Sequence, residues 1–286
     1  MLILGLICCK IEKEVIILFF NVSPLNLKDT FECGQCFRWN KNPDGSYTGI
    51  AYKKVLNIKE SHDGFILSDD SKLWEEYFDL STDYNKIMST LSCDEIMKKA
   101  ISKASGIRIL KQEFPEVVIS FIISQNNNIP RIKSIIENLC KSFGSHLGNE
   151  NFSFPEMETL SALNPSDLAF LKAGYRDNYI IDAAQKLYLN QIDMNIIKSA
   201  PIDEARNEIS KIKGVGPKVA DCILLFGAYR TEVFPTDVWM KKVLTKFYGI
   251  KNLTPKEISR FADERFSKLA GYAQQYLFYS MRENKL

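Results

Sequence analysis

The stretch Gly214-Val215-Gly216-Pro217-Lys218-Val219-Ala220-Asp221-Cys222 predicts a tight glycine hairpin that runs directly into a helix. Both glycines allow positive φ and close approach by another molecule, and proline suits the first helical position because its missing N–H is not needed there. Apolar residues at helical spacing predict a helix over 202–212 and another over 219–226, which Gly227 is expected to close. The amides of this helix-hairpin-helix form a natural phosphate seat.

Lys218 falls in the first turn of the second helix, where the helix dipole disfavours an ammonium group. A neutral amine attacks electrophilic carbons and forms Schiff bases, and a phosphate seat beside it indicates chemistry on a sugar. Cys222 lies one turn later on the same face. Asp237 follows a break at Pro235 and is expected at the N-cap of a new helix. Two simpler roles stay open, a surface lysine for Lys218 and an ordinary N-cap for Asp237.

Beyond the hairpin, four segments add to the pattern. Residues 213–243 resemble the helix-hairpin-helix DNA glycosylases with a Gly/Pro-rich loop and an aspartate, and all five segments together resemble the 8-oxoguanine DNA glycosylase family. The resemblance runs from about residue 31 to the end of the chain. The four segments are Gly34-Gln35-Cys36-Phe37-Arg38-Trp39, Ser124-Gln125-Asn126-Asn127-Asn128-Ile129-Pro130-Arg131, Ala173-Gly174-Tyr175-Arg176 and Gly271-Tyr272-Ala273-Gln274-Gln275-Tyr276-Leu277-Phe278.

The resemblance implies a DNA repair enzyme that flips 8-oxoguanine out of duplex DNA and excises it. By this resemblance, Lys218 attacks C1′ of the flipped nucleotide and Asp237 stabilises the positively charged, sugar-like transition state. The resulting Schiff base permits β-elimination. The chain is therefore expected to be a bifunctional DNA N-glycosylase and apurinic/apyrimidinic-site lyase whose partner is double-stranded DNA.

The same resemblance assigns the binding residues. The carbonyl of Gly34 is expected to accept from the N7–H that only the oxidised purine carries. Cys222 and Phe278 cover the two faces of the base, and Gln274 reads its pairing edge. Residues expected to contact DNA, including the vacated space and the orphaned cytosine, are Asn126, Arg131, Tyr175, Arg176, Gly214 and Gly216.

Two positions depart from the family pattern. Trp239 stands where many relatives carry a histidine that touches a phosphate, and Pro130 precedes Arg131 where a small residue is usual. The preference for the base opposite the lesion is therefore left open. No cofactor or catalytic metal is expected to be required, although a structural monovalent or divalent cation at the hairpin formed by 214–216 is also left open.

Composition agrees with this interpretation. The chain has 286 residues, a formal charge of +2 and ten Lys and Arg against four Asp and Glu over 241–286, a basic end that fits a backbone-contacting face. Seven cysteines do not form a disulfide framework, which favours the cytoplasm, with action at the nucleoid in a prokaryote or in the nucleus of a eukaryote. The absence of cysteine after Cys222 disfavours the related iron-sulfur glycosylases, and Lys218 disfavours the alkylpurine branch.

The amino-terminal part alternates strand formers with turn formers. Met1–Cys9 is apolar but too short to span a bilayer, so strands are expected there and no membrane association. An antiparallel sheet is predicted through about residue 70, and helices from Ser71 onward. The fold class is α+β, with an N-terminal sheet domain over 1–100 and a helical domain over 101–286, acting as a monomer.

Three rival functions stay open beside the bifunctional enzyme. One is a monofunctional or differently selective glycosylase in which Lys218 is a spectator. Another is a non-enzymatic helix-hairpin-helix module that binds DNA. The last is a thiol oxidoreductase or metal site built on the C-x-x-C of Cys33 and Cys36.

Overall fold

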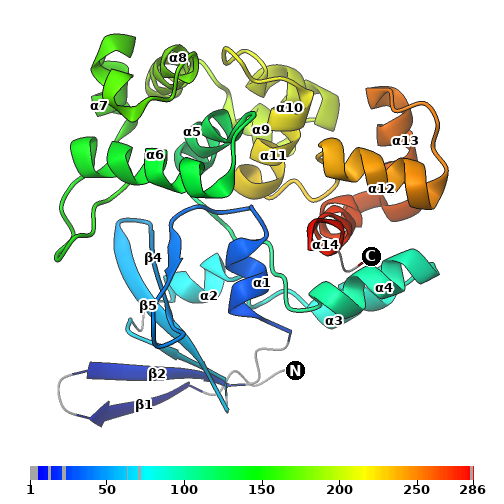
Figure 1. Ribbon diagram of the computed structural model, residues 1–286, viewed down its shortest axis with the longest axis horizontal. Helices are drawn as coiled ribbons and strands as arrows, with labels where there is room; N and C mark the ends of the chain where they lie inside the picture. Colours follow the sequence, from blue (N-terminus) through cyan, green and yellow to red (C-terminus); the bar gives the residue numbers. More distant parts are fainter. Residues whose placement is uncertain (1–5, 12–13, 21–23, 63, 70–71, 284–285) are drawn as a thin grey trace.

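A six-stranded antiparallel sheet forms the base of the molecule in Figure 1. The computed structural model describes residues 6–11, 14–20, 24–62, 64–69, 72–283 and 286, so the predictions for Met1–Gly5 lie outside the described residues. Burial alternates along β4, as expected for a strand with one face on a core. In spatial order the strands are β1 (Leu6–Ile11), β2 (Glu14–Phe20), β6 (Gly64–Leu67), β5 (Lys54–Ser61), β4 (Tyr47–Ala51) and β3 (Trp39–Lys41).

Aromatic side chains hold two short helices against this sheet. Helix α1 (Leu27–Glu32) places Phe31 against Trp39, with ring centroids 4.1 Å apart and the rings nearly parallel. Helix α2 (Leu73–Tyr77) adds Trp74, which is fully buried. Offset aromatic contacts of this kind add to the burial of apolar area. The loop that follows α1 carries residue 34, so this small core fixes one wall of the site described below.

The rest of the chain is helical, which confirms the α+β class and the order of sheet followed by helices (Figure 1). The division into domains after residue 100 stays a prediction. None of the helices in the described part of the chain has both the length and the apolar composition needed to cross a membrane. The helices are α3 (Tyr84–Leu91), α4 (Glu95–Ala104), α5 (Phe114–Ser124), α6 (Ile129–Phe143), α7 (Met157–Ser161), η1 (Pro165–Leu171), α8 (Arg176–Tyr188), α9 (Met194–Ser199), α10 (Ile202–Ile209), α11 (Pro217–Ala228), α12 (Val238–Tyr248), α13 (Pro255–Phe266), η2 (Ser267–Leu269) and α14 (Ala270–Arg282).

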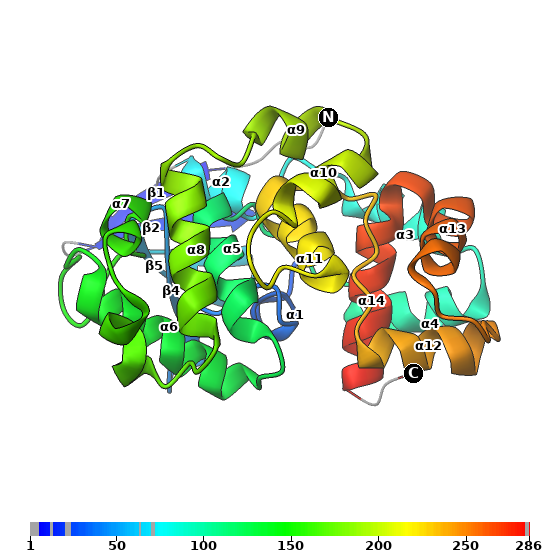
Figure 2. The ribbon, with the colours of Figure 1, turned by 90° about the horizontal axis from the view of Figure 1, so that it is seen from above.

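Helix α11 runs through the middle of the helical part, between α5 and α14 (Figure 2). Its residues from Val219 to Phe226 are all buried, so the helix is held by packing over most of its length. The predicted end at Gly227 is wrong, because Tyr229 takes the left-handed cap conformation and the helix extends to Ala228. A Cβ at residue 227 would lie 3.1 to 3.2 Å from Phe114 and Val117, so glycine there allows α11 to approach α5 closely.

The hairpin between α10 and α11 depends on one of its two glycines for positive φ. Gly214 has φ of +79°, and a Cβ there would lie 2.2 Å from the ring of Tyr179. Gly216 has φ of −91°, so of the two glycines only Gly214 uses the freedom to take positive φ. Nothing lies within 4 Å of a Cβ built on Gly216, which leaves open space for another molecule at the start of α11.

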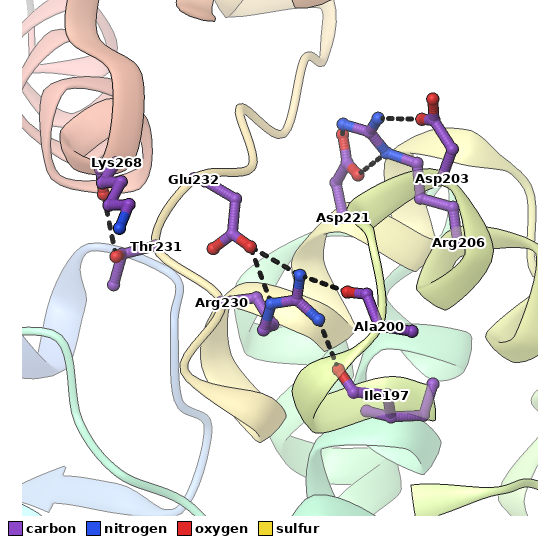
Figure 3. A network of polar contacts seen from close by, with 9 residues as sticks. All are labelled: Ile197, Ala200, Asp203, Arg206, Asp221, Arg230, Thr231, Glu232 and Lys268. Atoms are coloured by element: carbon purple, nitrogen blue, oxygen red, sulfur yellow. Dashed lines mark hydrogen bonds and ion pairs between the residues drawn. The ribbon is translucent and has the colours of Figure 1, made fainter. Parts of the chain in front are cut away.

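Two arginines tie the elements around α11 together (Figure 3). The Nε of Arg206 on α10 donates to the Oδ1 of Asp221 on α11 at 2.7 Å, and its Nη1 donates to Asp203 at 2.9 Å. Arg230, just after α11, donates to the carboxylate of Glu232 and to the carbonyls of residues 197 and 200. These charge-assisted bonds link α10 to α11 and the segment after α11 to the end of α9.

Candidate active site

A small cavity of about 50 Å³ lies where the loop after α1, α5, the start of α11, the segment before α12, and α14 meet. It brings together six of the residues that the sequence predicted, namely both candidate catalytic residues and the four candidate base-binding residues. The cavity is lined by Cys33, Gly34, Phe121, Lys218, Cys222, Phe226, Pro235, Asp237, Gln274, Gln275 and Phe278.

Lys218 is placed by the proline at the first position of α11, and its side chain is half-buried. Its Nζ lies 5.7 Å from the centroid of the Phe121 ring, so an aromatic face supports the amine. Cys222 follows one turn later and lines the same cavity, as the helical spacing predicts. Burial raises the pKa of the Cys222 thiol to about 11, although the nearby Lys218 opposes this, so the thiol is neutral near pH 7.

Asp237 is the N-cap of α12 and also a wall of the cavity. Its Oδ1 accepts from the backbone N–H of Trp239 at 3.0 Å and of Met240 at 2.9 Å. The cap fixes the carboxylate on the same cavity as Lys218 and satisfies two amides that the helix leaves without a partner. The capping role and the position at the site are therefore both present in one residue.

Gly34 and α14 form the opposite wall. Gly34 has φ of +87°, a conformation that glycine adopts without strain, and a Cβ there would lie 3.5 Å from Nη1 of Arg282 and 4.0 Å from the Phe278 ring. The Nε2 of Gln275 donates to the Oε1 of Gln274 at 2.8 Å, and both side chains are buried in the cavity wall. Phe278 is half-buried, and the Cζ of Arg282 lies 5.6 Å from its ring centroid.

The outer residues lie at two neighbouring loops. Asn126 and Arg131 are exposed around the start of α6, and Tyr175 is 51% exposed at the start of α8. The ring of Tyr175 lies 5.5 Å from that of Tyr179, which in turn packs on Gly214 of the hairpin. The structure thus places Tyr175 next to the hairpin, and all three of these residues lie outside the cavity lining.

Arg176 has a different environment from the one that its neighbours suggest. It is buried, its Nη1 donates to the carbonyl of Ala173 at 2.9 Å, and its Nε donates to the carbonyl of Gln125 at 3.1 Å. Its Nη2 also reaches the carbonyl of Asn126 at 3.3 Å. In the free protein, Arg176 is thus turned inward and holds the loop that carries Asn126, a role that the sequence did not indicate.

The two departures from the family pattern have defined surroundings. Pro130 lies in the first turn of α6, a position that tolerates proline, and the N-cap Asn128 accepts from the N–H of Arg131 at 3.1 Å. Trp239 is half-buried, with the Nζ of Lys242 at 4.6 Å from its ring centroid. The ammonium group of Lys242, one turn further along α12, therefore lies over the indole ring.

The C-x-x-C pair does not have the environment of a redox site. Burial raises the pKa of the Cys33 thiol to about 11 and that of Cys36 well above its ordinary value. Each thiol donates to a carbonyl of α1, at Thr30 and at Phe31. Because the thiolate is the reactive and metal-binding form, these two residues are suited to packing.

Three cavity residues were not singled out from the sequence. Phe226 follows Lys218 and Cys222 at four-residue intervals, so the helical spacing alone could have found it. Gln275 is adjacent to Gln274 and lines the cavity as well, which only the orientation of α14 decides. Phe121 had no local signal, since α5 is apolar on all sides.

Comparisons with known proteins agree with this geometry. The sequence model of the 8-oxoguanine DNA glycosylase N-terminal domain matches residues 17–118, and that of the HhH-GPD superfamily base excision DNA repair proteins matches residues 119–268. The N-glycosylase/DNA lyase of Saccharomyces cerevisiae is 32% identical over 268 residues, covering 82% of this chain and 71% of the yeast protein. A probable N-glycosylase/DNA lyase of Methanothermobacter thermautotrophicus is 30% identical over 235 residues, covering 74% of this chain and 75% of that protein.

One solved structure extends the agreement to the whole chain. The 8-oxoguanine glycosylase/lyase of Clostridium acetobutylicum, in complex with double-stranded DNA containing cytosine opposite 8-oxoG, superposes with a TM-score of 0.90 at 38% identity. The superposition covers 98% of this chain and 99% of that one. With both domain models matched in sequence order and a cavity lined by a lysine and an aspartate, this chain belongs to the 8-oxoguanine DNA glycosylase family.

Proposed function

We propose that Lys218 and Asp237 catalyse the two reactions of this enzyme, an N-glycosylase/DNA lyase that excises 8-oxoguanine from DNA. One observation supports this assignment above the others. The amine and the carboxylate come from different helices, yet they line one cavity together with the side chains expected to hold the base. The hairpin that would receive the DNA backbone directly precedes the lysine.

The reaction follows from this pairing. The amine of Lys218 attacks C1′ of the flipped nucleotide and releases a proton, and the bond from C1′ to the base breaks as the base leaves with its electron pair and takes up a proton. The carboxylate of Asp237 stabilises the positive charge that develops on the sugar. Opening of the sugar ring gives a Schiff base, loss of a C2′ proton follows, and the 3′ phosphate leaves by β-elimination.

The base would enter the cavity between Cys222 and Phe278. At about 50 Å³ the cavity of the free protein is much smaller than the roughly 300 to 1,000 Å³ of typical ligand pockets. A purine therefore requires the wall to move, and we expect the half-buried Phe278 to be the side chain that does so. In this arrangement Gln274 reads the pairing edge and the carbonyl of Gly34 accepts from N7–H.

The duplex would lie across the outer loops. Asn126, Arg131 and Tyr175 are exposed there, and the amides around Gly214 and Gly216 would receive a phosphate. Arg176 holds the loop that carries Asn126 through hydrogen bonds to main-chain carbonyls. It would reach the orphaned base only by giving up these bonds for bonds to the base. We propose that a monomer binds double-stranded DNA in this way; a cation at the hairpin stays a prediction.

Borohydride trapping tests the nucleophile directly. The protein is mixed with a duplex carrying 8-oxoguanine opposite cytosine, and the reducible adduct is measured. Lys218→Gln is expected to bind the duplex but to give no adduct and no base release, because the amide cannot attack C1′. Lys213→Gln is the matched control, since its side chain is 71% exposed on the same hairpin, and it should still be trapped at saturating protein.

The outcomes separate the rival functions. Excision without an adduct in the natural protein would indicate a monofunctional glycosylase, and binding without turnover would indicate a DNA-binding module. Normal base release by Lys218→Gln would refute the nucleophile assignment. Repeating the single-turnover assay with 8-oxoguanine opposite each of the four bases measures the opposite-base preference.

A further inference from the structure

We infer that Gln275 is a second specificity-determining amide of the base pocket, and that its Oε1 accepts a hydrogen bond from the ring N1–H or the 2-amino group of a bound 8-oxoguanine. This inference rests on the proposed function of the cavity. In addition to Gln274, which is expected to read the pairing edge, Gln275 would discriminate guanine-type from adenine-type oxidised purines.

The first observation is an unpaired acceptor. Gln275 is 4% exposed, and its Oε1 is one of only four buried side-chain atoms without a hydrogen-bond partner among the described residues. Buried amides are almost always paired, because an unmet acceptor forfeits its hydrogen bonds to water. An unpaired acceptor in a cavity wall indicates that a bound ligand donates a hydrogen bond to it.

The second observation is the bond between the two neighbouring amides. Gln275 donates from Nε2 to the Oε1 of Gln274 at 2.8 Å, and both residues line the cavity. This bond fixes the orientation of each amide and occupies the nitrogen of Gln275 and the oxygen of Gln274. The groups that remain to meet a ligand are the acceptor Oε1 of Gln275 and the donor Nε2 of Gln274.

The acceptor of Gln275 and the donor of Gln274 are complementary to the pairing edge of guanine. Guanine presents an acceptor at O6 beside a donor at N1, with a further donor at the 2-amino group. The Nε2 of Gln274 would donate to O6 while the Oε1 of Gln275 accepts from N1–H or the 2-amino group. An 8-oxoadenine reverses the arrangement, with a donor at C6 and an acceptor at N1, so Gln275 would face a lone pair.

The test compares excision of two lesions in the full-length protein. Single-turnover rates at subsaturating protein are measured on duplexes carrying 8-oxoguanine or 8-oxoadenine opposite cytosine. Gln275→Met, which keeps the length of the side chain and removes both polar ends, is expected to reduce the preference for 8-oxoguanine by about 10- to 100-fold, the effect of leaving one buried group unmet. Gln275→Glu keeps an acceptor oxygen but loses the donor to Gln274, so it is expected to retain more of the preference than Gln275→Met does.

Binding to a duplex with an abasic-site analogue separates a base contact from loss of fold. That duplex has no base to read, so Gln275→Met should bind it like the natural protein. The inference is overturned if Gln275→Met keeps the full preference, or if Gln275→Met and Gln275→Glu lose it equally. It is also overturned if affinity for the abasic duplex falls as much as that for 8-oxoguanine. Failure of the natural protein to excise 8-oxoguanine would instead overturn the proposed function.

Discussion

Two regions differ in whether their buried polar groups have hydrogen-bond partners. One is the cavity wall formed by α14, and the other is the set of arginine ties around α11. Three of the four buried side-chain atoms that lack a partner in the described part of the chain are on α14, at Gln275, Tyr276 and Arg282. By contrast, the guanidinium groups of Arg206 and Arg230 each meet carboxylates or carbonyls (Figure 3). The first region borders the cavity, and the second links α11 to its neighbours α10 and α9.

The difference agrees with a ligand role for Gln275, which is the one of these three α14 residues that lines the cavity. A polar group that supports the fold is paired within the chain, because an unpaired buried group costs about 1 to 3 kcal/mol. A polar group that serves a ligand is left incomplete until the ligand arrives. Changes at the cavity should therefore alter catalysis and binding with little loss of stability, whereas changes at the ties should do the reverse.

Asp237→Asn should give the largest effect and tests the cavity side of the comparison. Asparagine caps a helix as well as aspartate, so the start of α12 should persist while the charge is lost. We expect the single-turnover rate of base release to fall about 100- to 1000-fold, the usual effect of removing one group that stabilises charge in a transition state. Urea unfolding should change by less than about 0.5 kcal/mol. An unchanged rate would reduce Asp237 to a cap.

Arg206→Met tests the arginine ties around α11. It leaves Asp221, whose pKa burial raises despite the paired Arg206, without its cation in a largely buried position. We expect the free energy of unfolding to fall by about 3 kcal/mol, as for a broken buried ion pair. The fraction of folded protein that is trapped by borohydride should not change.

Asp203→Ala is the matched control for the arginine tie. It removes the arm of the network that is 86% exposed, and exposed pairs contribute about 0 to 1 kcal/mol. Equal losses in Arg206→Met and Asp203→Ala would show that the contact between α10 and α11 does not depend on the Asp221 pair.

Phe278→Ala should have a smaller effect, confined to lesion recognition. Stacking of a base on an aromatic ring contributes about 1 to 3 kcal/mol. Titration with fluorescent duplexes should show affinity for 8-oxoguanine DNA reduced by about 10-fold or more, and affinity for undamaged duplex reduced less. Equal losses on the two duplexes would rule out the stacking role.

Glu116→Gln is expected to give the smallest effect, seen only as a change in pH dependence. Glu116 lies 3.4 Å from Arg38, yet burial raises its pKa to about 7. Between its unfolded pKa of about 4.5 and about 7, the folded chain holds a proton that the unfolded chain has released, so stability falls as pH rises through this window. Urea unfolding should show a fall of about 1 kcal/mol between about pH 6 and 7 that Glu116→Gln lacks. Parallel pH profiles would contradict this.

The amino-acid sequence by itself determined the features that depend on neighbouring residues. The hairpin before Lys218, the shared face of Lys218 and Cys222, and the cap at Asp237 were all predicted, because each signal is contained within one or two helical turns. The α+β order followed from the change of hydrophobic period near residue 70.

Only the tertiary structure decided which distant residues meet. Phe121 and Gln275 come from two separate helices, and nothing in their local sequences sets the rotation of those helices about their axes. The inward turn of Arg176 was likewise hidden, because its partners are carbonyls of a loop about fifty residues away. Periodicity specifies that a face is buried, but the close packing of one helix against another determines what that face touches.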